Sequence, residues 1–260
     1  MSQYLAAVWK CRYFWMSLVL MDLRSRYRRS VLGMGWSLLQ PIAMTAILCA
    51  VFPKLFGQSV REYAPRALVG VCFWSFITSC TLLGCQCLFN GERYIRQYPA
   101  PMAIYPLRTV LGASFHFMIA LCLVVLMRFA LAGFTGISSF VAIVPTLLLL
   151  VIVGWSLAVL AGFLTAYFPD MQHLAEVGLQ ILFYGTPIIY PAEMLRERGL
   201  GWIVDINPLA AFLELLRRPL TLGEFPAAGS FTFAGLSTLV IVSAATFTLV
   251  RLQKKIVFQL

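Results

Sequence analysis

An arginine cluster followed directly by a long uncharged run constrains this chain most. Arg24, Arg26, Arg28 and Arg29 precede the run, which contains no charged residue from Ser30 to Pro53. A guanidinium group is costly in hydrocarbon and is stabilised among lipid phosphates. The junction therefore predicts the cytoplasmic face of a membrane, with the uncharged run crossing to the other side.

The composition supports an integral membrane protein. The 260 residues are 61% hydrophobic and only 12% charged, whereas soluble domains carry about 25% charged residues. We expect an all-α integral membrane fold, because helices satisfy their own backbone groups in lipid. The net charge of +10 lies mostly beside apolar runs, which is the positive-inside pattern, so we exclude nucleic acid as a partner.

The apolar runs predict six transmembrane helices, since each approaches or exceeds the roughly 20 residues that a spanning helix needs. An N-terminal amphipathic helix over residues 1–31 precedes them and is expected to lie in the membrane interface. The alternative, a first span over residues 13–21, is too short to cross. The predicted spans are residues 32–56, 67–90, 104–127, 140–167, 174–190 and 225–250.

Residues 191–224 differ from the rest because they mix arginines with acids. They predict short external helices over about 191–198 and 208–218, between spans five and six. Basic clusters at 24–29, 93–108 and 251–255 fall on the opposite side, so the positive-inside rule places both termini in the cytoplasm. The whole chain, residues 1–260, is expected to form a single transmembrane domain.

The sequence lacks the motifs of common catalytic sites. It contains no GxxxxGK[ST] phosphate-binding loop and no HExxH, and Cys85 and Cys87 have no accompanying histidine cluster. We therefore predict no catalytic residue, no metal and no cofactor in this chain, and no nucleotide hydrolysis. A proton-driven carrier normally places acids within its spans. Here the only candidates are Asp170 and Glu176, both near a cytoplasmic end, so we expect a pathway-forming subunit that takes its energy from a partner.

His116 in the third predicted span leaves an alternative open. A lone intramembrane histidine can relay protons, which would make the chain a proton-coupled carrier. It can equally be a hydrogen-bonded residue at a helix contact. The only acid within a predicted span, Glu176, lies near the cytoplasmic end of span five, which favours the second interpretation.

Aromatic residues inside the predicted spans have two interpretations. Most such side chains pack in a core, but aromatic faces also suit the C–H faces of sugar rings. The candidates for lining a channel are Trp36, Phe73, Trp74, Phe76, Phe183 and Tyr184.

Four stretches together resemble the ABC-2-type permeases that export O-antigen, teichoic acid and capsular polysaccharides. They are RYRRSVLGMGWSLLQP at 26–41, IRQYPAPMAIYPLRTV at 95–110, YFPDMQHLAEVGLQILFYGTPIIYP at 167–191 and NPLAAFLELLRRPL at 207–220. The resemblance covers essentially the whole chain in the same order. Pro169 before Asp170 is closer to capsule exporters, whereas many O-antigen members have Arg there.

The resemblance implies partners in a bacterial inner membrane. Two copies of the chain would form a homodimer around a channel for lipid-linked polysaccharide, and two separate ATP-binding cassette subunits, which carry ATP and Mg, would dock in the cytoplasm. The external helices would act as a gate. Arg24, Arg26, Arg28 and Arg29 would bind the lipid phosphate, as suits guanidinium groups. Residues that would couple to the ATPase are Arg93, Tyr94, Ile95, Arg96, Tyr98, Pro99, Pro169 and Asp170.

Three rival functions remain at this point: an ABC-2 exporter of small hydrophobic compounds, the proton-coupled carrier using His116, and a membrane-bound enzyme that processes glycans. The coupling segments could also be ordinary solvated turns, although exposed apolar clusters tend to mark contact sites.

Overall fold

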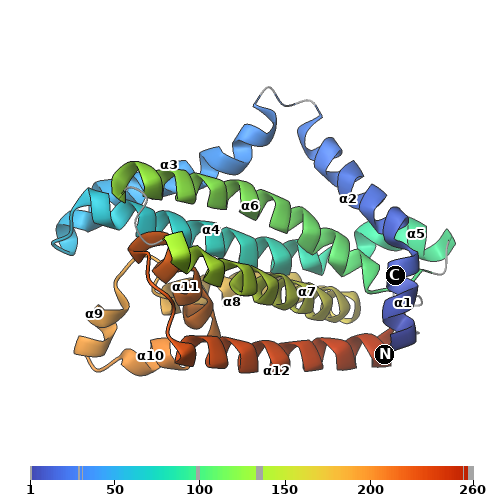
Figure 1. Cartoon of the computed structure of the whole chain (residues 1–260). Helices are drawn as coiled ribbons and strands as arrows, with labels where there is room; N and C mark the ends of the chain where they lie inside the picture. Colours follow the sequence, from blue (N-terminus) through green and yellow to red (C-terminus); the bar gives the residue numbers. More distant parts are fainter. Residues whose placement is uncertain are drawn as a thin grey trace.

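The computed structural model describes residues 2–28, 30, 32–97, 100–132, 137–253 and 255–256, and every regular element within these ranges is a helix. The prediction of an all-α fold is confirmed (Figure 1). In chain order the α-helices are α1 (Ser2–Lys10), α2 (Arg12–Tyr27), α3 (Trp36–Leu55), α4 (Val60–Cys85), α5 (Glu92–Gln97), α6 (Ile104–Ala132), α7 (Ile143–Tyr167), α8 (Met171–Gly185), α9 (Ala192–Glu197), α10 (Gly201–Asp205), α11 (Pro208–Arg217) and α12 (Ala228–Leu252). Short 3-10 turns η1 (Gly33–Gly35), η2 (Phe89–Gly91) and η3 (Ile137–Ala142) and a π-helical turn η4 (Arg218–Leu222) adjoin them.

Five helical stretches among the described residues are long and apolar enough to cross a membrane. They are Gly33–Leu55, Val60–Cys85, Ile104–Leu131, Ser138–Tyr167 and Ala228–Leu252. The fifth predicted span, residues 174–190, coincides with α8, which has only 15 residues and a length of about 22 Å, against a hydrocarbon thickness of roughly 30 Å. This crossing therefore stays a prediction.

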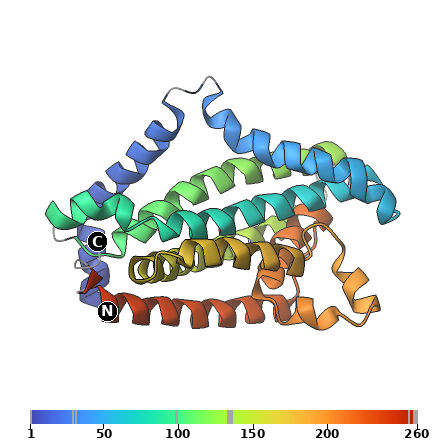
Figure 2. The same ribbon diagram turned by 180° about the vertical axis from the view of Figure 1, so that it is seen from behind.

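Helix α4 lies at the centre of the bundle, with α6 on one side and α7 and α12 on the other (Figures 1 and 2). Its most apolar stretch is 61% buried, compared with 22% for α3 and for α12. Small residues allow α4 and α7 to approach closely: a Cβ atom added to Gly84 would lie 2.7 Å from the Cα of Ala158. Such contacts are typical of helices that pack in membranes.

The start of α4 differs from the sequence prediction. The helix begins at Val60 instead of Ala67 and ends at Cys85 instead of Asn90. Ser59 caps it, because its hydroxyl accepts a hydrogen bond from the Glu62 backbone N–H at 3.3 Å. Ser59 and Glu62 have the spacing of a capping box, a signal that the charge content of this stretch obscured. The charged residues expected in a loop thus occupy the first turns of α4.

The N-terminal segment forms two helices rather than one over residues 1–31. The chain bends at Cys11, between α1 and α2. Helix α2 packs against α6 and then rises away from the bundle towards the start of α3 (Figures 1 and 2). Leu18 of α2 is 3% exposed. Its position in a membrane interface stays a prediction.

The described elements define two ends of the molecule. Helices α1 and α5 and the C-terminal end of α12 lie at one end, here called the α5 end, and α9 and α10 lie at the other, here called the α9 end (Figure 1). Short helices were predicted between spans five and six, and α9 and α11 occupy these positions, with α10 between them.

The break between α8 and α9 is held by side chains from α4 and α11. Thr186 is extended (φ −102°, ψ 134°), as expected of a residue before proline. Arg217 donates from Nη2 to the Ile188 carbonyl at 2.8 Å and from Nη1 to the Pro187 carbonyl. The Tyr63 hydroxyl donates to the Ile189 carbonyl at 2.8 Å. These hydrogen bonds pair three backbone carbonyls that have no partner within a helix.

Candidate functional site

The C-terminal end of α2 carries the predicted phosphate-binding arginines. Arg24, Arg26 and Arg28 are exposed, while Arg29 lies outside the described residues. Arg26 and Arg28 line a cavity of about 400 Å³ together with Ser25 and Ser30, whereas Arg24 does not. Basic residues in a last helical turn also interact favourably with the helix dipole, which explains why this end can carry several of them.

Two adjoining cavities form a polar groove between α2, α3, α4 and α6, here called the α2–α3 groove. They have volumes of about 430 Å³ and 180 Å³, and both are lined by Arg26, Ala113 and His116. The larger is also lined by the polar residues Asp22, Asn90, Arg108 and Thr109. The smaller is also lined by Trp36, Ser37, Gln40, Ser75, Phe76 and Ser79. The groove thus has a charged part and a part rich in hydroxyl groups.

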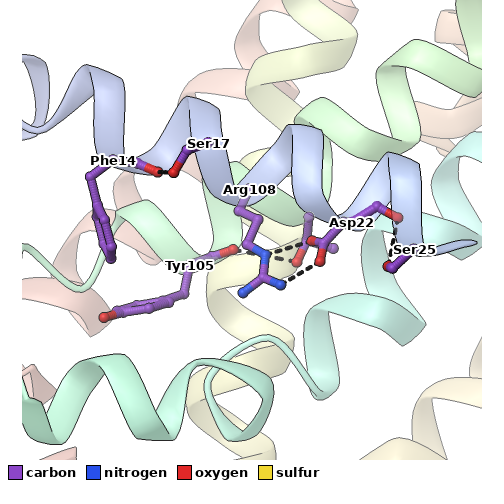
Figure 3. A network of polar contacts seen from close by, with 7 residues as sticks. Phe14, Ser17, Asp22, Ser25, Tyr105 and Arg108 are labelled. Atoms are coloured by element: carbon purple, nitrogen blue, oxygen red, sulfur yellow. Dashed lines mark hydrogen bonds and ion pairs between the residues drawn. The ribbon is translucent and has the colours of Figure 1, made fainter.

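An ion pair between α2 and α6 lies in the charged part of the groove (Figure 3). Arg108 donates from Nε to Asp22 Oδ2 at 2.5 Å and from Nη2 to the other carboxylate oxygen. The Arg108 side chain is only 12% exposed, and that of Asp22 is 44% exposed. Sequence reasoning missed this pair. The sequence did contain a hint, because Asp22 is a single acid within the basic N-terminal segment. The residue spacing, however, did not indicate which basic residue would pair with it.

His116 joins α6 to α3 at the boundary of the two cavities. Its Nδ1 lies 2.9 Å from the Ser37 hydroxyl, which fits the hydrogen-bonded role at a helix contact. The larger cavity also contains Asp22, but that carboxylate is bound by Arg108.

The predicted channel-lining aromatics do not share one wall. Trp36 and Phe76 line the α2–α3 groove. Trp74, Phe183 and Tyr184 line a separate recess of about 350 Å³ between α4 and α8.

Phe73 is a correction to the predicted channel lining. Its side chain is 0% exposed and belongs to the main core, so it contacts other side chains and not a passing substrate. Residues 73, 74 and 76 point in three directions because successive helical residues are rotated by about 100°.

Helix α5 contains four of the eight residues predicted to couple to a partner. Arg93 and Arg96 are exposed, and Arg96 forms an ion pair with Glu92 at 2.8 Å. Tyr94 is half-buried against Phe14, with ring centroids 5.8 Å apart. Tyr98 and Pro99 lie outside the described residues.

Ile95 is a second correction. It was predicted to couple to the ATPase, but it is 8% exposed and packs into a core cluster with Leu88 and Tyr105, so it faces the protein and not a partner. On a helix, an apolar residue flanked by charged ones faces the protein. The exposed face of α5 is therefore basic.

The turn between α7 and α8 is the other predicted coupling segment. Pro169 and Asp170 are exposed, and Phe168 is 50% exposed beside them. The Gln86 side chain, just after α4, donates a hydrogen bond to the Gln172 side chain in the first turn of α8. Figures 1 and 2 place this turn towards the α5 end, so the two predicted segments lie at the same end of the molecule.

Comparison with known proteins identifies relatives along most of the chain. The chain is similar to the O-antigen export system permease protein RfbA of Klebsiella pneumoniae, with 26% identity over 193 residues, or 74% of each chain. It is also similar to the protein of the same name from Myxococcus xanthus, with 22% identity over 199 residues, or 76% of each chain. The Polysialic acid transport protein KpsM of Escherichia coli is 23% identical over 232 residues, or 86% of this chain and 87% of that one.

The family profile described as ABC-2 type transporter matches residues 13–220, from the first turn of α2 to η4. This match confirms the resemblance seen in the sequence motifs. The protein is thus a multi-pass membrane protein that belongs to the ABC-2 type transporter family.

Proposed function

We propose that this chain is the membrane subunit of an ATP-driven exporter that moves lipid-linked polysaccharide across a bacterial inner membrane. Membership of the ABC-2 type transporter family supports it, as do relatives named for O-antigen export. The observation that carries it is the α2–α3 groove, where guanidinium groups adjoin a wall of hydroxyl, amide and indole groups. That pairing suits a cargo with a phosphate at one end and sugar beyond it.

In this proposal the arginines at the end of α2 bind the lipid phosphate. Arg26 and Arg28 share a cavity, and Arg26 also lines both parts of the groove. The phosphate therefore stays within reach of Arg26 as the first sugar enters the groove. Ser37, Gln40 and Ser75 offer hydrogen bonds to sugar hydroxyls. A second copy of the chain completes the channel, and α9 to α11 cover its external opening as a gate.

The energy comes from two ATP-binding cassette subunits, which hold ATP and Mg. They dock at the α5 end, against the basic face of α5 and the exposed turn at Pro169 and Asp170. Gln86, which follows α4 and precedes α5, donates a hydrogen bond to Gln172 in the first turn of α8. This contact links the turn at Pro169 and Asp170 to the segment that leads into α5, so movement of the turn is passed towards α5. The α5 end and both termini are cytoplasmic in this arrangement.

Reconstitution of the chain with its ATPase in proteoliposomes tests the proposal. We expect lipid-linked glycan to stimulate ATP hydrolysis and to cross the bilayer only when ATP is present. Stimulation by small hydrophobic compounds instead of glycan would support a drug exporter. Transport that needs no ATPase and fails in His116→Ala would support a proton-coupled carrier, and glycan turnover by the isolated chain would support an enzyme.

A capsular polysaccharide is the second candidate cargo. The similarity to the Polysialic acid transport protein KpsM extends over 86% of this chain, more than the similarity to the RfbA proteins. The same assay separates the two cargoes when an acidic glycan on a phospholipid is compared with an O-antigen-type glycan on a polyprenyl diphosphate. Preferential transport of the acidic glycan favours the capsular function.

A further inference from the structure

The ion pair between Asp22 and Arg108 has the geometry of a phosphate-binding contact. A guanidinium group that donates from both Nε and Nη2 binds phosphate oxygens in the same forked manner as carboxylate oxygens. Here the acceptor is a carboxylate from another helix, 86 residues away in the chain. The third nitrogen of Arg108, Nη1, is buried and has no hydrogen-bond partner among the described residues. Arg108 thus keeps donor capacity beyond what Asp22 uses.

The cavity around the pair carries an excess of positive charge. Its lining includes the guanidinium groups of Arg26 and Arg108 and a single carboxylate, that of Asp22. Arg26 forms no ion pair among the described residues and is exposed. A cavity of about 430 Å³ with this lining is large enough for a phosphate group, whose charge exceeds that of a carboxylate near neutral pH.

We propose that Asp22 occupies the place of a phosphate: a lipid-borne phosphate or diphosphate replaces the Asp22 carboxylate on Arg108 and releases α2 from α6. The inference rests on the proposed function and names the residues that admit its phosphorylated cargo. Helix α2 then acts as a latch, because the α2–α3 groove opens only when an anion replaces Asp22 as the partner of Arg108.

The burial of the two partners makes an exchange more favourable than simple separation. A nearly buried guanidinium group left without an anion is strongly unfavourable, so Arg108, at 12% exposure, keeps the latch closed until a replacement arrives. Asp22 is already 44% exposed, so its transfer to water costs little. The latch is therefore specific for an anion and does not respond to an apolar tail alone.

Hydrogen exchange of the full chain in lipid nanodiscs tests the latch. We expect farnesyl diphosphate to speed amide exchange in α2 by about tenfold, within the usual range for coupled sites, and farnesol to have no effect. Inorganic pyrophosphate at the same concentration should act weakly. An equal effect of pyrophosphate would overturn the lipid-borne source, and an effect of farnesol would overturn the role of phosphate. Slower or unchanged exchange in α2 with farnesyl diphosphate would overturn the latch.

Asp22→Asn provides the matching variant, because it keeps the shape of the side chain and removes its charge. We expect fast exchange in α2 without ligand and no further response to farnesyl diphosphate. Glu92→Gln is the control, since it breaks the ion pair of Glu92 with Arg96 in α5 and should leave α2 unchanged. Slow exchange in α2 of Asp22→Asn, with a normal ligand response, would contradict the proposal.

The double variant D22R/R108D separates a latch from a structural ion pair. It restores opposite charges but moves the guanidinium group from α6 to α2. If the pair serves only to hold the helices together, the double variant recovers export and the farnesyl diphosphate response. The latch predicts that neither recovers in protein that assembles normally. If glycan export itself fails for the wild type while farnesyl diphosphate still releases α2, the proposed cargo is wrong and the latch stands.

Discussion

Arg217 shows how a single residue supports the irregular backbone near the α9 end. Its side chain is buried and no carboxylate binds it among the described residues. Burial is the main cause that lowers its pKa to about 9, which still leaves the guanidinium group charged at neutral pH. The carbonyls of Pro187 and Ile188 accept its hydrogen bonds. The N–H groups of Arg217 therefore donate the hydrogen bonds that helical backbone N–H groups would donate if the helix continued.

Replacing Arg217 tests this role. Arg217→Ala leaves two carbonyls unpaired and opens a cavity, so we expect a loss of about 2 kcal/mol in the free energy of unfolding. Arg198→Ala is the control, because Arg198 is exposed and its side chain forms no hydrogen bond or ion pair among the described residues. Thermal unfolding of the purified variants in detergent gives the comparison. Equal melting temperatures for Arg217→Ala and the wild type would contradict the role.

The arginines at the end of α2 differ in what they line, which gives a second test at the residue scale. Arg26 and Arg28 share a cavity that Arg24 does not line. We therefore expect R26A/R28A to reduce export by about tenfold, as for the loss of a charge-assisted contact worth 1.5 kcal/mol or so. Arg24→Ala should reduce it far less. Export of lipid-linked glycan in proteoliposomes measures both, and equal losses would remove the distinction.

Residue identities alone predicted part of the site. The basic cluster and the absence of a nucleotide-binding loop can be read from local sequence. The pairing of Asp22 with Arg108 could not, because it depends on how α2 packs against α6. The inward direction of Ile95 could have been read from the charged residues around it, and the Ser59 cap from its spacing to Glu62. No local sequence feature predicted that Arg217 is buried, since the adjacent residue of the same type, Arg218, is partly exposed.

At the scale of helices, the contact between α4 and α7 depends on small side chains. Gly84 faces Ala158, and a Cβ atom on Gly154 would lie 2.9 Å from the sulfur of Cys80. Van der Waals packing of this kind, rather than a hydrophobic driving force, holds helices together in lipid. Small residues at these positions thus allow α4 to pack closely at the centre of the bundle.

Two glycine substitutions test the contact. Gly84→Ala places a Cβ atom 2.7 Å from the backbone of Ala158, and we expect overpacking to cost about 1–3 kcal/mol. Gly235→Ala in α12 is the control, because no atom lies within 4 Å of its added Cβ. Alanine favours a helix by about 1 kcal/mol over glycine, so Gly235→Ala should be neutral or stabilising. Opposite shifts in melting temperature are the expected result, and a stabilised Gly84→Ala would contradict the close approach.

Helix α5 gives a test of coupling. Arg96→Glu reverses a charge on the exposed face of α5 and places it beside Glu92, so we expect several-fold weaker co-purification of the ATPase. Arg251→Glu is the control, since it reverses a charge on exposed Arg251 of α12 at the same end. Pull-down of the tagged chain from membranes measures the bound ATPase. Undiminished recovery with Arg96→Glu would exclude α5 as the contact.

Most helices could be predicted from hydropathy, but their ends required other information. The runs at 32–56, 104–127, 140–167 and 225–250 each coincide with a helix to within a few residues. The end of α8 was indicated by Gly185 and Pro187, which disfavour a continuing helix. The bend at Cys11 had no such signal, because neither glycine nor proline occurs there.

For the whole molecule, charge and topology make the two ends chemically different. The α5 end presents basic residues from α1, α5 and α12, while the α9 end mixes arginines with acids and pairs Arg196 with Asp205 at 2.8 Å. A surplus of unpaired basic residues is typical of the cytoplasmic side. The proposed orientation follows from this asymmetry.

Single-cysteine labelling tests the orientation in intact cells. In a background with Cys11, Cys49 and Cys122 replaced by serine, a membrane-impermeant maleimide should label Arg198→Cys and not Asp170→Cys. The remaining cysteines are buried and should stay unlabelled. Permeabilised cells should give labelling at both positions. Labelling of Asp170→Cys in intact cells would reverse the orientation.

The shortness of α8 has a consequence for the lipid around it. At about 22 Å, this 15-residue helix falls several ångströms short of the roughly 30 Å hydrocarbon layer. Acyl chains next to its exposed apolar side, which includes Ile181 and Tyr184, must compress, unless another protein surface covers it. Hydrophobic mismatch of this kind makes a protein sensitive to bilayer thickness. Shorter-chain lipids should therefore suit this flank better than longer ones.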